Sequence, residues 1–310
     1  MNAGRLSFLS IIFIFALLLC GDTRAQFSDI NVNHLVVFGD SYTADGSDNI
    51  NGPKWVRQLA NAWSNTTLLN YAVGGALCND TPSTASHSSV EKQATLFLQN
   101  STRFDPNTTV YSIFVGINDM VNGVSAPDVV ACIHGEMLRL NQQVQGTHFL
   151  IFNMVPFHRS PRILLDNTVA QSQQWIQQFN QLLNSTLAQM QGFDIVLIDN
   201  FNVVSNVLDN PANFGITQNI TDYYLRTHSK TSPNIDQEAN QYAWFDITHV
   251  TNIVHQQITA AITGQQPFQS IPLARSPSLS LSAPNALSRG ATAVTSLVFA
   301  VATVCLYVLF

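Results

Sequence analysis

Charged side chains are scarce in this chain. Only 10% of its 310 residues are Asp, Glu, Lys or Arg, with 13 basic residues against 19 acidic ones. Such a low charge fraction excludes a chain that is kept disordered by its own charge. The net charge of −6 also argues against a nucleic-acid-binding protein. Hydrophobic residues make up 46% of the sequence, which is ample for the core of one large domain.

Metal-binding patterns and internal repeats are also missing. The 8 histidines are scattered along the chain. No His-Glu-x-x-His motif and no paired Cys-x-x-Cys motif occurs in the sequence. We therefore expect a protein that needs neither a metal nor another cofactor.

Long apolar runs occur only at the two ends of the chain. Residues 6–20 are nearly all apolar, follow Arg5, and lead to the small-x-small pattern that ends at Ala25. A run of about 15 apolar residues is short for a membrane span but typical of a secretory signal peptide. The sequence therefore predicts a signal peptide over residues 1–25 and a mature domain over residues 26–269.

The C-terminal run has a different layout. Residues 293–310 are apolar and uncharged up to the last residue, and the preceding 270–292 segment is rich in Ser, Pro and Ala, with small residues around Ser282 and Asn285. This is the layout of a glycosylphosphatidylinositol (GPI) attachment signal. A single-pass membrane anchor is the alternative, but no basic cytoplasmic stop follows the tail. We expect a secreted, extracellular protein that is attached to the cell surface in one of these two ways.

Cysteine usage agrees with a secretory route. Of the 4 cysteines, Cys20 lies in the predicted signal peptide and Cys305 in the C-terminal tail. The remaining two, Cys78 and Cys132, are expected to form a disulfide, with two buried free thiols as the alternative. Six Asn-x-Ser/Thr sequences also predict a glycoprotein. The acceptor residues would be Asn65, Asn79, Asn100, Asn107, Asn184 and Asn219.

Short apolar runs alternate with segments of helical periodicity along the body of the chain. This alternation predicts an α/β fold: a doubly wound, flavodoxin-like parallel sheet of five strands, flanked by helices on both faces. Residues 210–244 show no clear period and are expected to be irregular structure near the site. The expected strands are 34–38, 68–73, 110–115, 148–154 and 193–198, and the main expected helices are 53–63, 127–145, 168–190 and 247–263.

Small and polar residues follow three of the predicted strands. Ser41 comes after the first strand in a Gly-Asp-Ser turn, Gly74-Gly75 follows the second, and Asn118 follows the third. Ligands bind outside the carboxyl ends of the strands in such sheets, so we expect these residues to meet there. Each motif alone also has a structural explanation, as a turn or a helix cap. Their combination at one edge favours a functional site.

An acid and an imidazole lie three residues apart near the end of the domain, at Asp246 and His249. On a turn that enters a helix, the carboxylate can hold the imidazole in the tautomer that accepts a serine proton. A helix cap followed by a surface histidine is the structural alternative. For acyl transfer, the backbone N–H groups of Ser41 and Gly75 and the amide of Asn118 are candidate donors to a developing oxyanion.

The four blocks FGDSY, NYAVGGA, GIND and DITH together resemble the GDSL/SGNH esterase–lipase superfamily. The resemblance covers Phe38 to His249 and implies an SGNH hydrolase fold. It further implies that Ser41 is the nucleophile, His249 the base and Asp246 its orienting acid. Ser41, Gly75 and Asn118 would form the oxyanion hole.

Longer segments, VVFGDSYTADG, LLNYAVGGALCND and VYSIFVGIND, resemble the fungal acetylesterases of carbohydrate esterase family 16. This similarity implies an enzyme that removes acetyl groups from acetylated mono- or oligosaccharides. We expect the enzyme to be a monomer. Two alternatives remain open: a lipase or thioesterase for longer acyl chains, and a non-catalytic cell-surface protein of the same fold. The sequence does not decide the natural ester.

Overall fold

The computed structural model describes residues 31–46, 50–80, 88–100 and 104–264. At its centre lies a five-stranded sheet in the order β2-β1-β3-β4-β5, with every neighbouring pair parallel. This order confirms the doubly wound, flavodoxin-like α/β fold predicted from the sequence. The strands are β1 His34–Gly39, β2 Thr67–Asn70, β3 Thr109–Phe114, β4 His148–Phe152 and β5 Asp194–Ile198.

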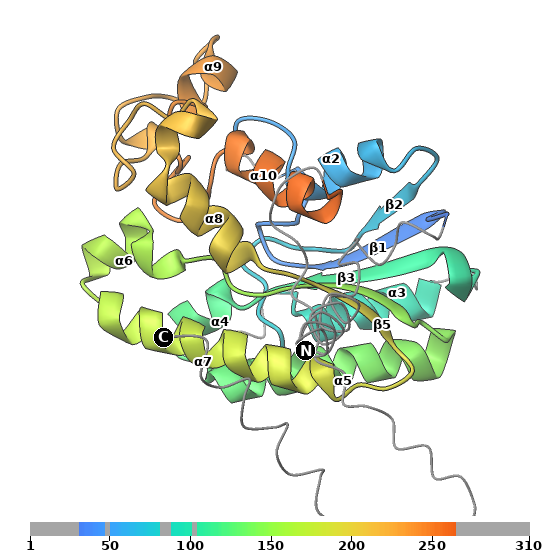
Figure 1. Ribbon diagram of the computed structural model, residues 1–310. Helices are drawn as coiled ribbons and strands as arrows, with labels where there is room; N and C mark the ends of the chain where they lie inside the picture. Colours follow the sequence, from blue (N-terminus) through green and yellow to red (C-terminus); the bar gives the residue numbers. More distant parts are fainter. Residues whose placement is uncertain (1–30, 47–49, 81–87, 101–103, 265–310) are drawn as a thin grey trace, which may run out of the picture. The chain divides into compact units, whose positions relative to one another are not determined.

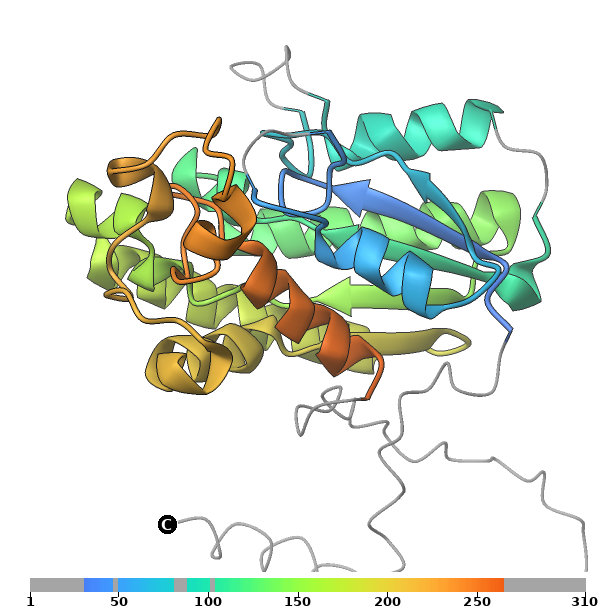
Figure 2. The same cartoon turned by 90° about the horizontal axis from the view of Figure 1, so that it is seen from above.

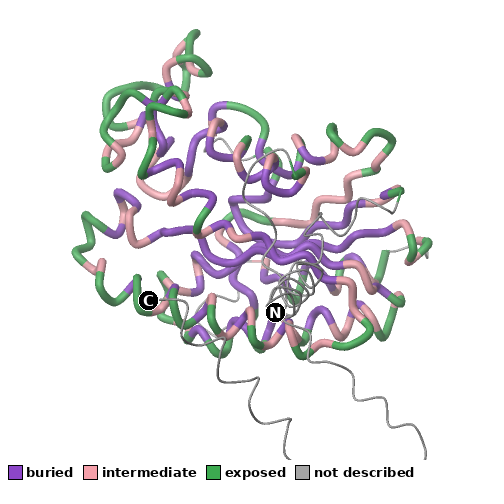
Figure 3. The backbone as a smooth tube through the Cα atoms, in the orientation of Figure 1, coloured by how far each residue is buried: buried purple, intermediate pink, exposed green. Residues whose placement is uncertain are grey.

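Helices cover both faces of the sheet (Figure 1). One layer consists of α2 Trp55–Ala62, α8 Asn200–Asp209 and α10 Asn252–Ile262, and the other of α3 Val90–Asn100, α5 Ala126–Val144 and α7 Val169–Ala188. Strands β1, β3, β4 and β5 are buried on both sides (Figure 3), which explains why they are continuous apolar runs rather than alternating ones. The edge strand β2 is only partly buried. Shorter helices are α4 Ile117–Val121, α6 Pro161–Asp166 and α9 Ile235–Ala239, with 3₁₀ turns at Pro106–Thr108, Phe157–Arg159, Pro211–Phe214 and Tyr224–Arg226.

The order of the strands places the candidate site. The chain passes from β1 to β2 on one side and then returns to β3 on the other, so the connections diverge between β1 and β3. In an open parallel sheet this switch point opens a crevice at the carboxyl ends of the strands. The segment from 210 to 251 gathers at the same edge, at the left of Figure 2.

Two element boundaries differ from the predicted ones by three residues or more. Strand β2 ends at Asn70 rather than at residue 73, because the Asn70 side chain turns the backbone by accepting the Ala72 N–H at 3.1 Å. The closing helix starts at Asn252 rather than at residue 247. Residues before it form a tight turn and a bridge between Trp244 and Val250 instead. His249 therefore precedes the helix.

The irregular segment has a small core of its own. Tyr224, Tyr242 and Phe245 form a hydrophobic cluster with Ala239, separate from the main core. Tyr224 is fully buried and stacks on Phe245, with ring centroids 5.6 Å apart. These tyrosines are therefore structural residues of the segment rather than open platforms for a sugar.

A disulfide joins Cys78 to Cys132, with the Cα atoms 6.1 Å apart. It ties the loop after β2 to helix α5, and the Cys78 N–H also donates to Asp119 Oδ1 at 2.9 Å. The loop that carries Gly74 and Gly75 is thereby fastened to the body of the domain.

The predicted glycan acceptors differ in their exposure. Asn184 is half-buried within α7, and its Oδ1 atom is buried without a hydrogen-bond partner among the described residues. A glycan at Asn184 would require that side chain to turn outward. The other five are exposed: Asn65, Asn79, Asn100, Asn107 and Asn219.

The predicted signal peptide (1–25), the 270–292 segment and the apolar tail (293–310) lie outside the described residues. All described residues belong to one compact unit. Among these residues, no helix is long and apolar enough to cross a membrane.

Replacing Cys78 and Cys132 together by Ala is expected to lower the free energy of unfolding. The bridge spans 54 positions, so its loss frees a long loop in the unfolded state, an effect of about 4 kcal/mol. Urea unfolding of the wild type and the double variant measures it, with the wild type in reducing agent as the control. An unchanged unfolding midpoint would show that the bridge does not stabilise the fold.

Candidate active site

The turn after β1 places Ser41 at the carboxyl edge of the sheet. Gly39 ends the strand with a φ of 155°, and a Cβ atom there would lie 2.3 Å from the Phe114 carbonyl oxygen. Only glycine allows β1 to approach β3 this closely. Ser41 then lies in a tight turn in which Thr43 and Ala44 N–H groups donate to the Asp40 carbonyl. Its side chain keeps a narrow opening to solvent, with 8% of the residue exposed.

Two side chains that could not be identified from the sequence hold this turn in place. The side-chain amide of Gln93 in α3 makes two hydrogen bonds to the backbone of Gly39. Its Oε1 accepts the Gly39 N–H at 2.8 Å, and its Nε2 donates to the Gly39 carbonyl at 2.9 Å. Gln93 is 54 positions away, so no local pattern reveals the contact.

Lys54 is the second such residue. Its buried ammonium donates to the carbonyl of Ser41 at 2.5 Å and to that of Ala44 at 2.8 Å. Burial lowers the pKa of Lys54 to about 8, although Asp40, Asp45 and Asp246 oppose the shift. A cation thus supports the backbone of the nucleophile turn from inside the protein.

Asp246, His249 and Ser41 form one chain of hydrogen bonds. The distance from His249 Nε2 to Ser41 Oγ is 2.8 Å, and His249 Nδ1 lies 2.8 Å from Asp246 Oδ2. Because the carboxylate is an acceptor, it favours the tautomer with the proton on Nδ1. Nε2 carries no proton in that tautomer and can accept the serine proton. The fold thus unites residues that are 208 positions apart.

The turn from Asp246 to His249 is closed by the aspartate itself. Its Oδ1 accepts the N–H groups of Thr248 and His249, each at 2.7 Å. Burial alone would raise the pKa of Asp246, but the hydrogen bonds and charge of His249 and the backbone donors outweigh it and lower this pKa below its usual value. The carboxylate therefore stays ionised beside the imidazole.

Further contacts join the histidine turn to its surroundings. The Tyr42 hydroxyl, next to Ser41, donates to the Thr248 carbonyl at 2.8 Å. On the other side, the Arg162 N–H of α6 donates to the Ile247 carbonyl at 2.8 Å. The relative position of Ser41 and His249 is therefore set by further hydrogen bonds besides the one between their side chains.

The candidate oxyanion donors lie around the serine. The backbone N–H groups of Ser41 and Gly75 make no hydrogen bond within the part of the chain that the structure describes. Gly75 has a φ of 80°, which favours glycine. The neighbouring Gly74 lies beside Ser41, because a Cβ atom on it would be 3.9 Å from Ser41 Cβ. The N–H groups of Ser41 and Gly75 are thus available to a ligand.

Asn118 is already engaged. Its Nδ2 donates to the Ala76 carbonyl at 3.1 Å and lies 3.4 Å from Asp40 Oδ2. The second contact is long, so the hydrogen directed at Asp40 is the one that a developing oxyanion could take.

Two buried carboxyl groups, those of Asp40 and Asp119, lie close to the candidate oxyanion donors. Burial raises the pKa of Asp40 to about 7, assisted by the charge of Asp119 and opposed by the Tyr42 N–H and by Lys54. Burial likewise raises the pKa of Asp119 to about 6, against the hydrogen bond from the Cys78 N–H. Across the described ranges, no cluster of three His, Cys, Asp or Glu residues is arranged to hold a metal ion.

Comparison with known proteins yields matches over most of the domain. A model of the GDSL-like Lipase/Acylhydrolase family matches residues 35–262. An acetylesterase of Thermothelomyces thermophilus is 23% identical over 233 residues, which cover 60% of this chain and 77% of the relative. The thermolabile hemolysin of Vibrio parahaemolyticus is 21% identical over 226 residues, covering 67% of this chain and 53% of the hemolysin.

Solved structures also match. A lipolytic protein of the G-D-S-L family from Veillonella parvula has a TM-score of 0.48 at 14% identity, covering 73% of this chain and 93% of that one. A carbohydrate acetylesterase from Sinorhizobium meliloti has a TM-score of 0.48 at 13% identity, with coverages of 75% and 97%.

Asp40→Asn is expected to flatten the pH dependence of stability. The pKa of Asp40 in the folded protein, about 7, lies above its value in the unfolded chain, so between these two pKa values only the folded state holds the carboxyl proton. The free energy of unfolding therefore falls as the pH rises from 5 to 8 and Asp40 loses this proton. The variant keeps an oxygen acceptor for the Tyr42 N–H but cannot ionise. Urea unfolding at pH 5 and pH 8 should show a fall in unfolding free energy that is smaller in the variant by about 2 kcal/mol. Parallel profiles would contradict burial of an ionisable Asp40.

Proposed function

This chain belongs to the GDSL-like lipase/acylhydrolase family, and from that membership we propose that it is a serine acetylesterase acting through Ser41, His249 and Asp246. The family match and the acetylesterase relative establish a carboxylic ester hydrolase and confirm the resemblance drawn from the four sequence blocks. The observation that supports the specific residues is the hydrogen-bond chain from Ser41 Oγ through the imidazole to the Asp246 carboxylate.

In the proposed reaction, Ser41 Oγ attacks the ester carbonyl carbon while His249 Nε2 accepts the hydroxyl proton. The developing imidazolium is stabilised by the ionised Asp246. The tetrahedral oxyanion is held by the N–H groups of Ser41 and Gly75 and by the Asn118 amide.

The imidazolium then protonates the alcohol oxygen, and the bond between that oxygen and the acyl carbon breaks. A water molecule, deprotonated by His249, attacks the acyl-enzyme and releases the acid and free Ser41. The reaction requires no group beyond these side chains, the backbone N–H groups of Ser41 and Gly75, and water.

For the substrate, we propose an acetylated mono- or oligosaccharide and a monomeric enzyme. The acetylesterase of Thermothelomyces thermophilus supports the acetyl group, and the segments that resemble family 16 carbohydrate esterases support the sugar. We further propose that the enzyme is secreted, glycosylated and held at the cell surface by its C-terminal GPI signal or tail. The terminal runs and the acceptor sequences support this location.

Ser41→Ala is expected to lower turnover of p-nitrophenyl acetate by at least about 10³-fold, because the acyl-enzyme cannot form. Asp246→Asn should lower it by about 10²–10⁴-fold, because the imidazole loses its orienting charge. Ser185→Ala, which changes an exposed serine of α7, is the matched control and should match the wild type. A Ser41→Ala variant with more than a tenth of wild-type turnover would exclude Ser41 as the nucleophile.

A further inference from the structure

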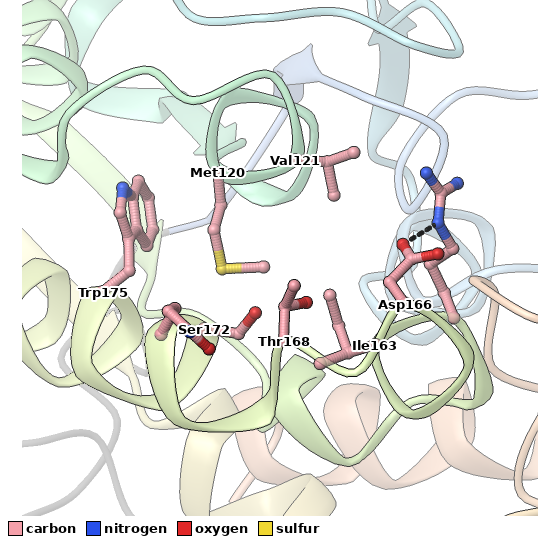
Figure 4. Close-up of a pocket in the computed structure, with 9 residues that line it drawn as sticks. Met120, Val121, Ile163, Asp166, Thr168, Ser172 and Trp175 are labelled. Atoms are coloured by element: carbon pink, nitrogen blue, oxygen red, sulfur yellow. Dashed lines mark hydrogen bonds and ion pairs between the residues drawn. The ribbon is translucent and has the colours of Figure 1, made fainter.

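A pocket of about 280 Å³ lies between α4 on one side and α6 and α7 on the other (Figure 4). Met120 and Val121 of α4 line one side, two and three positions after Asn118. Across from them lies α6, whose Arg162 N–H donates to Ile247 in the turn between Asp246 and His249. The pocket is therefore bordered by the helix that carries one proposed oxyanion donor and by the helix that supports the base.

Three polar side chains in this pocket have no partner among the described residues. Thr168, Gln171 and Ser172 all line it, and none of their side-chain polar atoms makes a hydrogen bond in that part of the chain. Thr168 is the residue before α7, where a threonine hydroxyl usually caps the helix, yet it makes no capping bond. Ser172 is only 6% exposed. Thr168 and Ser172 lie opposite Met120 and Val121 (Figure 4) and, with Gln171, remain available to a ligand.

The remaining wall is apolar or neutralised. Trp175 and Ile163 contribute apolar surface, and the Trp175 ring is fixed by a hydrogen bond from its indole N–H to the Val124 carbonyl and by stacking on Phe179 at 5.3 Å. Arg162 and Asp166 form an ion pair with each other, so neither presents an isolated charge.

The volume of the pocket and the chemistry of its lining together indicate which class of ligand it can bind. Drug-sized ligands occupy pockets of about 300–1,000 Å³, so this one suits a smaller molecule and is much larger than an acetyl methyl group requires. A long acyl chain would leave the hydroxyls of half-buried Thr168 and buried Ser172 without partners, which is costly, whereas Gln171 is exposed and keeps its contact with water. A polyhydroxylated ring can form hydrogen bonds with these polar side chains and can pack its apolar face against Trp175 and Ile163.

We propose that this pocket is the subsite for the sugar ring of the ester, with Thr168 and Gln171 as residues that determine specificity. The inference rests on the proposed function and extends it, because it assigns the saccharide part of the substrate to particular side chains. Ser172 adds a second hydroxyl at the same wall, beside that of Thr168.

The test compares two acetate esters, xylose tetraacetate and p-nitrophenyl acetate, in the wild type and in Thr168→Val/Gln171→Leu. The double variant should lose about tenfold or more in kcat/KM for the sugar ester, mainly through KM, and change less than twofold for p-nitrophenyl acetate. Gln173→Leu is the matched control, since it lies on α7 roughly 200° around the helix and does not line the pocket.

Three results would overturn the subsite. The first is an equal change for both esters, including no change in either. The second is a wild-type preference for p-nitrophenyl octanoate over acetate that the double variant strengthens, which would assign the pocket to an acyl chain. The third is a wild type that hydrolyses no ester, which would refute the proposed function together with the subsite; in the first two cases Ser41-dependent hydrolysis persists and only the subsite fails.

Discussion

The contact between Ser41 Oγ and His249 Nε2, at 2.8 Å, is the interaction on which the proposed chemistry depends. A serine hydroxyl is a weak nucleophile until a base takes its proton, and the base here comes from the other end of the domain. The contact exists because the parallel sheet brings the turn after β1 and the turn before α10 to one edge. Tyr42 joins the same two turns through its hydroxyl and the Thr248 carbonyl, so the alignment does not rely on one hydrogen bond.

Three ionisable side chains are buried close to this contact, although the chain has few charged residues. Lys54, Asp40 and Asp119 are all buried around the nucleophile turn and the proposed oxyanion donors. Burial moves the pKa of each toward neutrality, to about 8, 7 and 6 respectively. Burying ionisable groups costs stability, and perturbed pKa values of this kind gather at functional sites. Their backbone hydrogen bonds explain what these groups do there: they fix the carbonyls and N–H groups of the loops that surround Ser41.

Much of the fold and the site could be predicted from local patterns. The strands are visible because double burial makes them continuous apolar runs, and Ser41, Asn118 and His249 are visible because each lies in a short motif beside such an element. Gln93 and Lys54 could not be predicted, because their partners are backbone atoms in a distant turn. The predicted start of α10 was wrong because the helical spacing of apolar residues continues back to residue 247. In the structure the Asp246 side chain accepts the N–H groups of Thr248 and His249 and closes a turn there instead. The small core around Tyr224 could not be predicted either, since a core inside an irregular segment leaves no period in the sequence.

Covalent labelling measures the central claim most directly. An organophosphonate that reacts with activated serines should add one phosphonyl group to the protein, and peptide mass spectrometry should place it on Ser41. His249→Ala should abolish the labelling, because the hydroxyl then keeps its proton. Labelling at another residue, or undiminished labelling of Ser41 without the imidazole, would contradict the account.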